Sequence, residues 1–337
     1  MTVSEIANAA GVSTGTVDRV LHNRGGVSKK TKEKIEAIIK ENGYQPNLMA
    51  RQLKNNKTYK LGVLLPCLDT GCGYYYSLYK GMITAKETLE PFKFELILKE
   101  YDRTKSLDCF RKGTELVNEG IDGLITSPLV PNEFYELTPL FENIPYVFVD
   151  SPLNITGPLC TIAQNPYKSG YCAGRIMKLL KGGESGNYVC LKMNNNAYNL
   201  NERYRGFKDY INRDSASKVI EATCLEFNEI GVYSFLEGIF QEHKQISGIF
   251  VPHAEVLLAT YYLVNKGIKD KVTLIGYDSV AQNTKALRDG TIDCLIGQRP
   301  EIQGFEAVQK LYHSLMLHKE VSDTLEIPID IYFRENI

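Results

Sequence analysis

The chain has 337 residues, of which 43% are hydrophobic and 23% are charged, and its net charge is −1. This length exceeds what one hydrophobic core usually organises, so we expect two or three globular domains. No apolar run approaches the roughly twenty residues that span a bilayer, and no export signal precedes the first polar segment. The eight cysteines are scattered without metal-ligand spacing, so we expect reduced thiols, no metal or other cofactor, and a cytoplasmic protein.

Residues 2–21 have the pattern of two short helices joined by a tight turn. Thr2 and Glu5 can form a capping box for the first helix, and Gly11 permits the turn that follows. Ser13 is a suitable N-cap for a second helix over 14–21. That helix places Val17, Val20 and Leu21 on one apolar face and polar residues on the other. A short helix of this kind, after a four-residue turn, is typical of DNA major-groove recognition.

A third helix is predicted from the cap Ser28 through Lys30–Glu41, and a short helical pattern follows at 48–53 before the polar linker 54–58. Residues 1–58 contain ten basic and five acidic side chains, which gives a net charge of +5. Because the whole chain carries −1, the remainder carries −6. A basic head on an acidic body suits contact between the head and the phosphates of nucleic acid.

From residue 60 onward, short apolar runs alternate with helical patterns. The predicted strands lie near 61–65, 94–99, 123–126, 145–150, 187–193, 248–251 and 272–277. Strand–helix alternation predicts parallel sheets with right-handed crossovers, covered by helices on both faces. The alternation is too long for one sheet, so we expect two doubly wound lobes. The predicted division between them falls near 155–162, 292–298 and 320–328.

Polar side chains follow several of these strands. In open parallel sheets, ligands bind beyond the carboxyl ends of the strands. This rule selects acceptors, donors and aromatic rings suited to the hydroxyls and C–H faces of a sugar, namely Tyr74, Tyr75, Asp150, Asn194, His253, Asp278 and Gln298. An aspartate after a strand also often caps a helix, so a purely structural role is the alternative for Asp150 and Asp278.

The sequence resembles the lactose-repressor (LacI) family. The resemblance rests on ordered short matches in the head, which include Gly11-Val12-Ser13, Thr16-Val17, Arg19-Val20, Val27-Ser28, Gly43-Tyr44, Pro46-Asn47 and Ala50-Arg51-Gln52-Leu53. It implies an all-α helix-turn-helix head joined to an α/β core of two doubly wound parallel-sheet lobes, similar to type I periplasmic binding proteins. The implied effector-binding residues include Arg203, which precedes Gly206-Phe207. One departure is His253-Ala254, where the family usually has Asn-Asp.

We therefore expect a helix-turn-helix domain at 1–46, a hinge helix and linker at 47–58, and an effector-binding and dimerisation core at 59–337. The N-terminal lobe is predicted at about 59–158 plus 295–322, and the C-terminal lobe at about 159–294 plus 323–337. In the resembled family, hinge leucines wedge into the DNA minor groove. The expected DNA-binding residues are Thr2, Ser4, Ser13, Thr14, Gly15, Thr16, Arg19, Asn23, Ser28, Thr31, Asn47, Ala50, Arg51 and Leu53.

The leading hypothesis is a homodimeric transcriptional regulator, expected to be a repressor, that binds a pseudo-palindromic double-stranded DNA operator. A small sugar or polyol bound between the lobes would control its operator affinity. One alternative is a sugar-binding protein of a transport system, which would explain the lobes but not the basic head. The other is an enzyme, which no nucleophile elbow, phosphate loop or metal cluster supports. We predict that the protein is not an enzyme.

Overall fold

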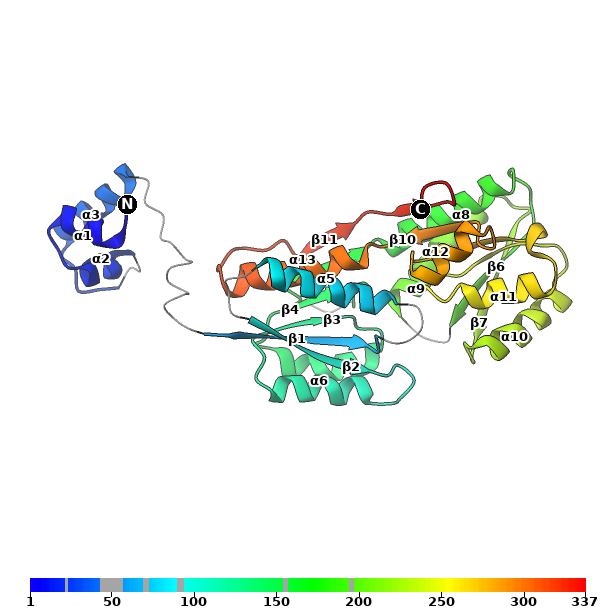
Figure 1. The fold of residues 1–337 in the computed structure, drawn as a ribbon, viewed down its shortest axis with the longest axis horizontal. Helices are drawn as coiled ribbons and strands as arrows, with labels where there is room; N and C mark the ends of the chain where they lie inside the picture. Colours follow the sequence, from blue (N-terminus) through cyan, green and yellow to red (C-terminus); the bar gives the residue numbers. More distant parts are fainter. Residues whose placement is uncertain (22–23, 43–56, 69–72, 90–93, 154–156, 194–196) are drawn as a thin grey trace. The chain divides into compact units, whose positions relative to one another are not determined.

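The computed structural model describes residues 1–337 except 22–23, 43–56, 69–72, 90–93, 154–156 and 194–196. Six predicted site residues lie outside the described residues, namely Asn23, Asn47, Ala50, Arg51, Leu53 and Asn194. The chain forms two compact units, Met1–Asn56 and Lys57–Ile337 (Figure 1). No helix in the described part of the chain is long and apolar enough to cross a membrane.

The described residues of the first unit form the helices α1 (Val3–Ala10), α2 (Thr14–Leu21) and α3 (Lys29–Glu41). Thr2 and Glu5 form the predicted capping box at α1, and the Ser28 side chain caps α3 by accepting from the backbone N–H of Thr31. Gly11 ends α1 in the left-handed region at φ 69°, which glycine adopts without steric cost. The helices enclose a small core of Ile6, Ala7, Ala10, Val17, Val20 and Ile35. The predicted helix-turn-helix pattern is confirmed.

The second unit is built on two six-stranded sheets. We call the first the N-lobe sheet; its order is β11 (Thr324–Ile327), β5 (Cys160–Gln164), β4 (Tyr146–Val149), β3 (Gly123–Thr126), β1 (Tyr59–Pro66) and β2 (Phe94–Tyr101). The second, the C-lobe sheet, has the order β12 (Asp330–Tyr332), β10 (Cys294–Gly297), β9 (Thr273–Tyr277), β8 (Ile246–Phe250), β6 (Asn187–Met193) and β7 (Lys218–Cys224). All pairs are parallel except β10 with β12.

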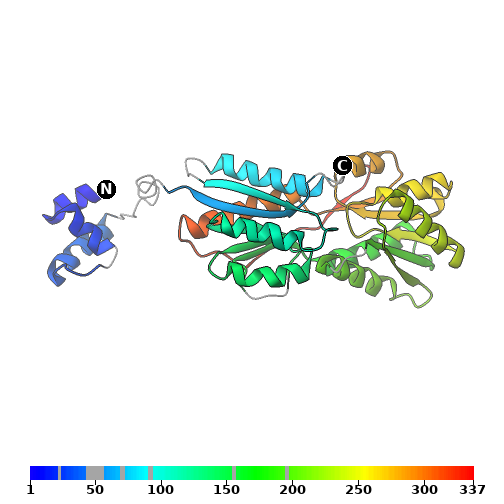
Figure 2. The same ribbon diagram turned by 90° about the horizontal axis from the view of Figure 1, so that it is seen from below.

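Helices cover both faces of each sheet, as Figures 1 and 2 show. The N-lobe helices are α5 (Tyr74–Thr88), α6 (Asp108–Asn118), α7 (Pro131–Leu137) with the 3-10 turn η1 (Thr138–Phe141), and α13 (Pro300–Leu315). The C-lobe helices are α8 (Pro166–Leu180), α9 (Tyr198–Ile211), α10 (Glu229–Glu242), α11 (Leu257–Asn265), η2 (Lys269–Lys271) and α12 (Ala281–Arg288). Each lobe therefore has two apolar clusters, one on either side of its sheet. The inner strands β3, β4 and β10 are buried along their whole length, which explains their continuous apolar sequences.

The lobe boundaries differ from those predicted. Strands β5 and β11 belong to the N-lobe sheet, whereas the prediction assigned both to the C-terminal lobe. Strand β10 belongs to the C-lobe sheet, although residues from 295 onward were assigned to the N-terminal lobe. In the described residues, the chain therefore crosses between the sheets after Gln164, Gly297 and Ile327. The last two crossings fall within the predicted division at 292–298 and 320–328. A strand of four or five residues has the same sequence pattern in either sheet, because its pairing partners are set by topology.

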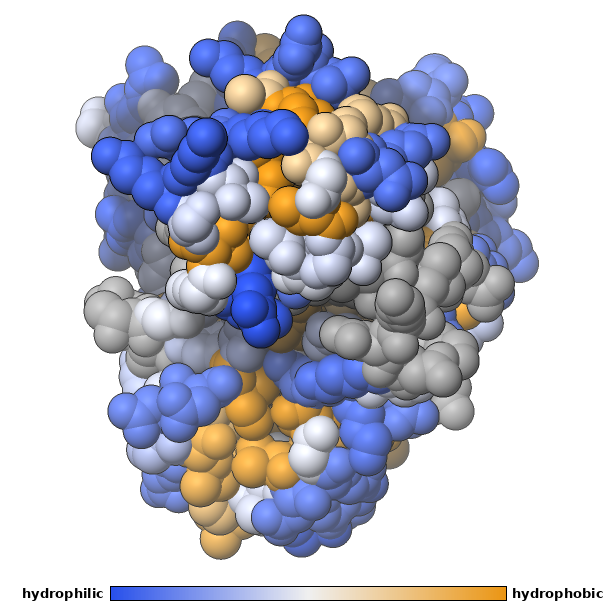
Figure 3. All heavy atoms as spheres, turned by 90° about the vertical axis from the view of Figure 1, so that its left-hand side faces the viewer, coloured by the Kyte–Doolittle hydropathy of each residue, from blue (hydrophilic) through white to orange (hydrophobic). Residues whose placement is uncertain are grey.

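Figure 3 colours each described residue by its hydropathy and shows both hydrophilic and hydrophobic side chains at the surface. Such a mixture is normal for a folded protein, since polar atoms alone cannot cover its surface.

Two glycines permit a close approach of α5 to α13. A Cβ atom added at Gly81 would lie 1.9 Å from the carbonyl oxygen of Glu301, and one added at Gly304 would lie 1.9 Å from that of Leu78. Backbone atoms cannot yield as a flexible side chain can. Glycine at these positions therefore brings α13, which begins at the second crossover, against the helix that carries Tyr74 and Tyr75.

We predict that Gly81→Ala lowers the free energy of unfolding by about 1–3 kcal/mol or more, because it forces the two helices apart. Gly238→Ala in α10 is the matched control, since its Cβ would meet nothing within 4 Å. The control should raise stability by up to about 1 kcal/mol through helix propensity. Urea denaturation measures both variants, and equal stabilities would contradict the close-packing argument.

Candidate functional site

The exposed surface of the head carries the described part of the predicted DNA-binding set. Thr2, Ser4, Ser13, Thr14, Gly15, Arg19 and Ser28 are exposed, and Thr16 and Thr31 are half-buried. The buried residues of α2 are Val17 and Val20, so this helix presents its polar side to solvent. Arg24 pairs with Asp18 at 3.5 Å on this side. The arrangement leaves α2 accessible to a partner along its polar face.

Several of these polar side chains also hold the helices together. The backbone N–H of Thr16 donates to Ser13 Oγ at 3.2 Å, and the N–H of Thr31 donates to Ser28 Oγ at 3.2 Å. Caps of this kind stabilise helix starts by about 1 kcal/mol. Ser13 and Ser28 therefore have a structural role in the head that accounts for part of their sequence pattern.

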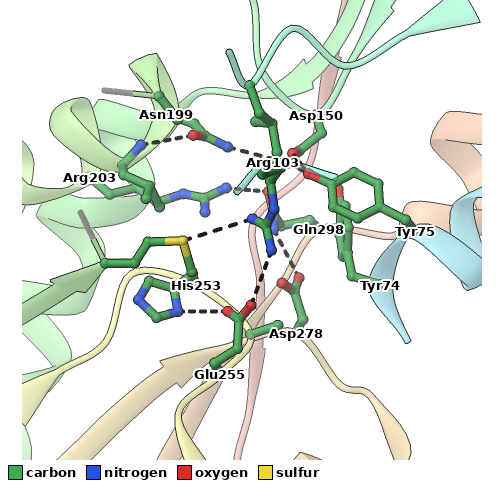
Figure 4. A pocket seen from close by; sticks show the side chains of 15 residues that line it. Tyr74, Tyr75, Arg103, Asp150, Asn199, Arg203, His253, Glu255, Asp278 and Gln298 are labelled. Atoms are coloured by element: carbon green, nitrogen blue, oxygen red, sulfur yellow. Dashed lines mark hydrogen bonds and ion pairs between the residues drawn. The ribbon is translucent and has the colours of Figure 1, made fainter. Parts of the chain in front are cut away.

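A polar pocket lies between the two lobes, at the carboxyl ends of the strands of both sheets (Figure 4). It holds about 440 Å³ of space free of atoms, part of which opens to solvent. Its lining residues are Tyr74, Tyr75, Arg103, Leu129, Asp150, Met193, Ala197, Asn199, Leu200, Arg203, His253, Ala254, Glu255, Asp278 and Gln298. The structure thus brings together seven of the eight predicted ligand residues, and the eighth, Asn194, lies outside the described part.

Asp150 is the centre of the N-lobe side of the pocket. It follows β4 directly and is 5% exposed. The hydroxyl of Tyr74 donates to Asp150 Oδ1 at 3.1 Å, and that of Tyr75 donates to Oδ2 at 3.0 Å. Asn199 Nδ2, from α9 of the C-lobe, lies 3.5 Å from Oδ1. These donors compensate for the burial of a carboxylate that would otherwise be costly.

Asp278 occupies the corresponding place in the C-lobe, immediately after β9. Gln298 Nε2 donates to Asp278 Oδ1 at 2.9 Å, and Gln298 Oε1 accepts from Arg203. Arg203 also donates to the carbonyl oxygen of Pro252 at 2.9 Å, and its guanidinium lies 4.1 Å from the ring centre of Tyr277. The stacked, buried guanidinium supplies the main positive charge beside both aspartates.

Both aspartates have left-handed backbones, with φ 65° at Asp150 and φ 66° at Asp278. Aspartate tolerates this region better than most residues, but it is uncommon for any side chain other than glycine. Each strand is thereby turned sharply at its end. Uncommon backbone conformations of this kind are concentrated at functional sites. Their occurrence at the same place in both lobes therefore indicates that these two carboxylates are functional groups.

A third group joins the lobes at the other side of the pocket. Arg103, two residues beyond β2, contacts Glu255 of the C-lobe at 3.6 Å and Met193 Sδ at 3.8 Å. Glu255 Oε2 lies 2.8 Å from His253 Nδ1, and the His253 ring packs edge-on against Phe227. Figure 4 shows the Arg103 side chain directed toward Glu255.

The pocket lining also includes Arg103, Asn199 and Glu255, which the sequence pattern did not predict. Arg103 would have followed from the strand-end rule if the second strand had been extended to Tyr101, where the structure ends it. Asn199 lies four residues before Arg203 on α9, and side chains at this spacing share one face of a helix. Glu255 lies two residues after His253, in the segment that follows β8.

Burial shifts the acid–base properties of these carboxyl groups. It raises the pKa of Asp278 to about 7, although the charge of Arg203 and the hydrogen bond from Gln298 oppose this. Burial also raises the pKa of Asp150 against the opposing effect of Arg203. Burial of Glu255 acts in the same direction, but its contact with His253 prevails and lowers its pKa to about 2. In the described part of the chain, no group of three or more His, Cys, Asp or Glu side chains is arranged to hold a metal ion.

We predict a pH dependence of stability that arises from Asp278. Its folded pKa of about 7 lies above the unfolded value near 3.9, so the folded state binds the extra proton. The contribution of Asp278 to the unfolding free energy therefore falls as the pH rises from about 4 to 7. Between pH 5 and 8, wild type should lose about 2 kcal/mol more than Asp278→Asn. Urea denaturation with the exposed Asp270→Asn as control checks this, and parallel pH profiles for wild type and Asp278→Asn would contradict it.

Comparisons with known proteins agree with this architecture. Residues 2–47 match the family model "Bacterial regulatory proteins, lacI family", and residues 114–319 match a periplasmic binding protein domain. The chain is 25% identical to the ribose operon repressor of Lactococcus lactis, over 100% of this chain and 98% of the relative. It is also 25% identical to the ribose operon repressor of Halalkalibacterium halodurans, over 99% of this chain and 96% of the relative.

A solved structure from Bacteroides fragilis, assigned as a LacI transcriptional regulator, is 28% identical and superposes with a TM-score of 0.78. It covers 83% of this chain, and 98% of the solved chain is matched. The helix-turn-helix head, the two parallel-sheet lobes and these matches over the whole chain lead to one conclusion. The chain combines a lacI-type helix-turn-helix domain over residues 2–47 with a core that belongs to the periplasmic binding protein domain family.

Proposed function

We propose that this protein is a cytoplasmic transcriptional repressor whose affinity for operator DNA is controlled by a small neutral sugar or polyol. The observation that carries the proposal is the pair of buried aspartates, Asp150 and Asp278, which enter one pocket from different lobes. A ligand that bonds to both carboxylates holds the lobes in one arrangement. It can therefore change the population of core conformations, which is the requirement for control of a second site.

The chemistry of the pocket supports a ligand rich in hydroxyl groups. Carboxylates accept hydrogen bonds from hydroxyls, while Arg203 and Asn199 donate to hydroxyl or ring oxygens. Arg203 Nε is buried and has no hydrogen-bond partner among the described residues, so it retains a donor for a ligand. Because the pocket contains three carboxylates and two guanidinium groups, an anionic ligand would add to the negative charge. The relatives named ribose operon repressors make D-ribose the first ligand to test.

The proposed DNA interface is the polar face of α2 in a positively charged head. Thr14 and Arg19 lie exposed on this helix, and an arginine can donate two hydrogen bonds to guanine in the major groove. The proposal extends to the predicted hinge residues Asn47, Ala50, Arg51 and Leu53, as contacts near the minor groove. Phosphate contacts from the remaining basic residues position the head, whereas base contacts give specificity.

A homodimer on a pseudo-palindromic operator is part of this proposal, because two identical heads read two half-sites related by twofold symmetry. We further infer that the protein is not an enzyme; D-ribose recovered unchanged after prolonged incubation, as followed by NMR, is the expected result.

We predict that Arg203→Ala weakens D-ribose binding by about 10- to 150-fold, which corresponds to one or two lost hydrogen bonds to a charged group. Isothermal titration calorimetry on the full-length protein measures this. Arg205→Ala is the matched control on the same helix, because Arg205 is exposed and pairs with Glu202. Wild-type affinity in Arg203→Ala would place the ligand site elsewhere.

The DNA-binding proposal is tested with duplexes selected by the full-length protein from a random library. The selected sequences should be palindromic. In fluorescence anisotropy, Arg19→Ala should weaken binding to the selected duplex by about 10- to 100-fold, because base contacts are lost. Lys40→Ala, which removes the same charge from an exposed position of α3, is the control. Equal losses by Arg19→Ala on selected and random duplexes would show that Arg19 contacts only phosphates.

A further inference from the structure

A fully buried glutamine connects the pocket to the chain segments that join the lobes. Gln303, in the first turn of α13, is 0% exposed. Its Oε1 accepts from the backbone N–H of Asp150 at 2.9 Å, and its Nε2 donates to the hydroxyl of Tyr74 at 3.2 Å and to the carbonyl oxygen of Gln298 at 2.8 Å. The orientation of this amide is fixed, since its oxygen faces a donor and its nitrogen faces a carbonyl.

Gln298 is the point where the contacts of the two lobes meet. Its main-chain oxygen accepts from Gln303 of the N-lobe, and its side chain bonds to Arg203 and Asp278 of the C-lobe. Asp150 and Asp278 are therefore joined through two glutamines, in addition to any ligand that bonds to both. Gln298 also lies on the second crossover, directly after β10.

A second buried glutamine joins all three crossovers. Gln164 ends β5 at the first crossover and is 2% exposed. Its Nε2 donates to the carbonyl oxygen of Gly297 at 2.9 Å, on the second crossover, and to that of Pro328 at 3.1 Å, on the third. The second and third crossovers are also joined by Arg299, whose guanidinium makes two 2.7 Å hydrogen bonds to Asp330.

These contacts form a continuous path that runs from Asp150 through Gln303 and the 297–298 segment to Gln164 and Pro328. Closure of two lobes about connecting segments requires changes in φ and ψ within those segments. Buried amides that lose their partners are costly, so the path favours arrangements in which every bond is kept. A movement of Asp150 is then passed along these hydrogen bonds to the segments that connect the lobes.

We propose that Gln303 and Gln164 are positioning residues that transmit the state of Asp150 to all three crossovers, so that the lobes move as one hinge. This inference rests on the proposed function in taking Asp150 as an effector contact. Neither glutamine lines the pocket, so each acts through other residues. The proposal assigns hinge control to buried side chains on the N-lobe side of the molecule rather than to ligand contacts alone.

Hydrogen exchange of the full-length protein without ligand tests the relay. Gln303→Met keeps the volume of the side chain but removes its hydrogen bonds. Peptides covering 296–300 and 326–331 should exchange about tenfold faster, the change expected when one buried hydrogen bond is lost. Strand β3 should exchange as in wild type. Gln309→Met, at a half-buried position farther along α13, is the matched control and should change neither region.

Gln164→Met interrupts the same path from its other end and provides an independent variant if Gln303→Met does not fold. It should also accelerate exchange at 296–300 and 326–331. Wild-type exchange at both segments in the folded variants overturns the relay. Uniformly faster exchange, with β3 included, also overturns it, because the glutamines would then contribute only to global stability.

A second arm adds saturating D-ribose. In wild type the ligand should slow exchange at 326–331, and in Gln303→Met this protection should disappear although calorimetry still shows the ligand bound. Protection retained in Gln303→Met overturns the relay. If wild type does not bind D-ribose, the proposed effector is wrong, while the ligand-free comparison still decides whether the glutamines couple the crossovers.

Discussion

The burial of two carboxylates at one interface between lobes is the constraint on which the rest of the structure depends. Asp150 and Asp278 each follow a strand, adopt a left-handed backbone, and lie 5% exposed. A buried carboxylate needs hydrogen-bond donors or a compensating charge. Tyr74, Tyr75 and Gln298 meet that need within the protein. A ligand with several hydroxyl groups can satisfy the same acceptors, so ligand binding and lobe contact involve the same atoms.

Because ligand binding and lobe contact involve the same atoms, a ligand in the pocket can change the arrangement of the lobes. The groups that would bind an effector already bond across the lobes, as Asn199 does to Asp150 and Arg103 to Glu255. A ligand must therefore exchange contacts with the protein, and the lobe arrangement responds to which contacts remain. The effect on DNA depends only on the difference in ligand affinity between core conformations. The sequence of the head determines which DNA is bound, and the chemistry of the pocket determines when.

Local chemistry made much of the molecule predictable from sequence. Thr2, Glu5 and Ser28 lie at the helix starts that they cap. The local sequence is therefore enough to predict these caps. Asp150 and Asp278 follow from the rule that parallel sheets place polar groups at strand ends. The lobe assignment of β5, β10 and β11 was wrong because a strand of four or five residues does not encode its neighbours. Gln164 and Gln303 gave no signal, since Gln164 bonds to Gly297 and Gln303 to Asp150, across more than 130 positions of the chain.

The central claim is that the pocket and the head are coupled through one conformational equilibrium, and linkage tests it most directly. The affinity of the full-length protein for D-ribose should be measured by calorimetry with and without its selected duplex. Bound DNA should change the affinity for D-ribose, and linkage requires this change to equal the factor by which D-ribose changes the affinity for DNA. A D-ribose affinity that is identical in the free and DNA-bound protein, with D-ribose binding intact, would contradict it.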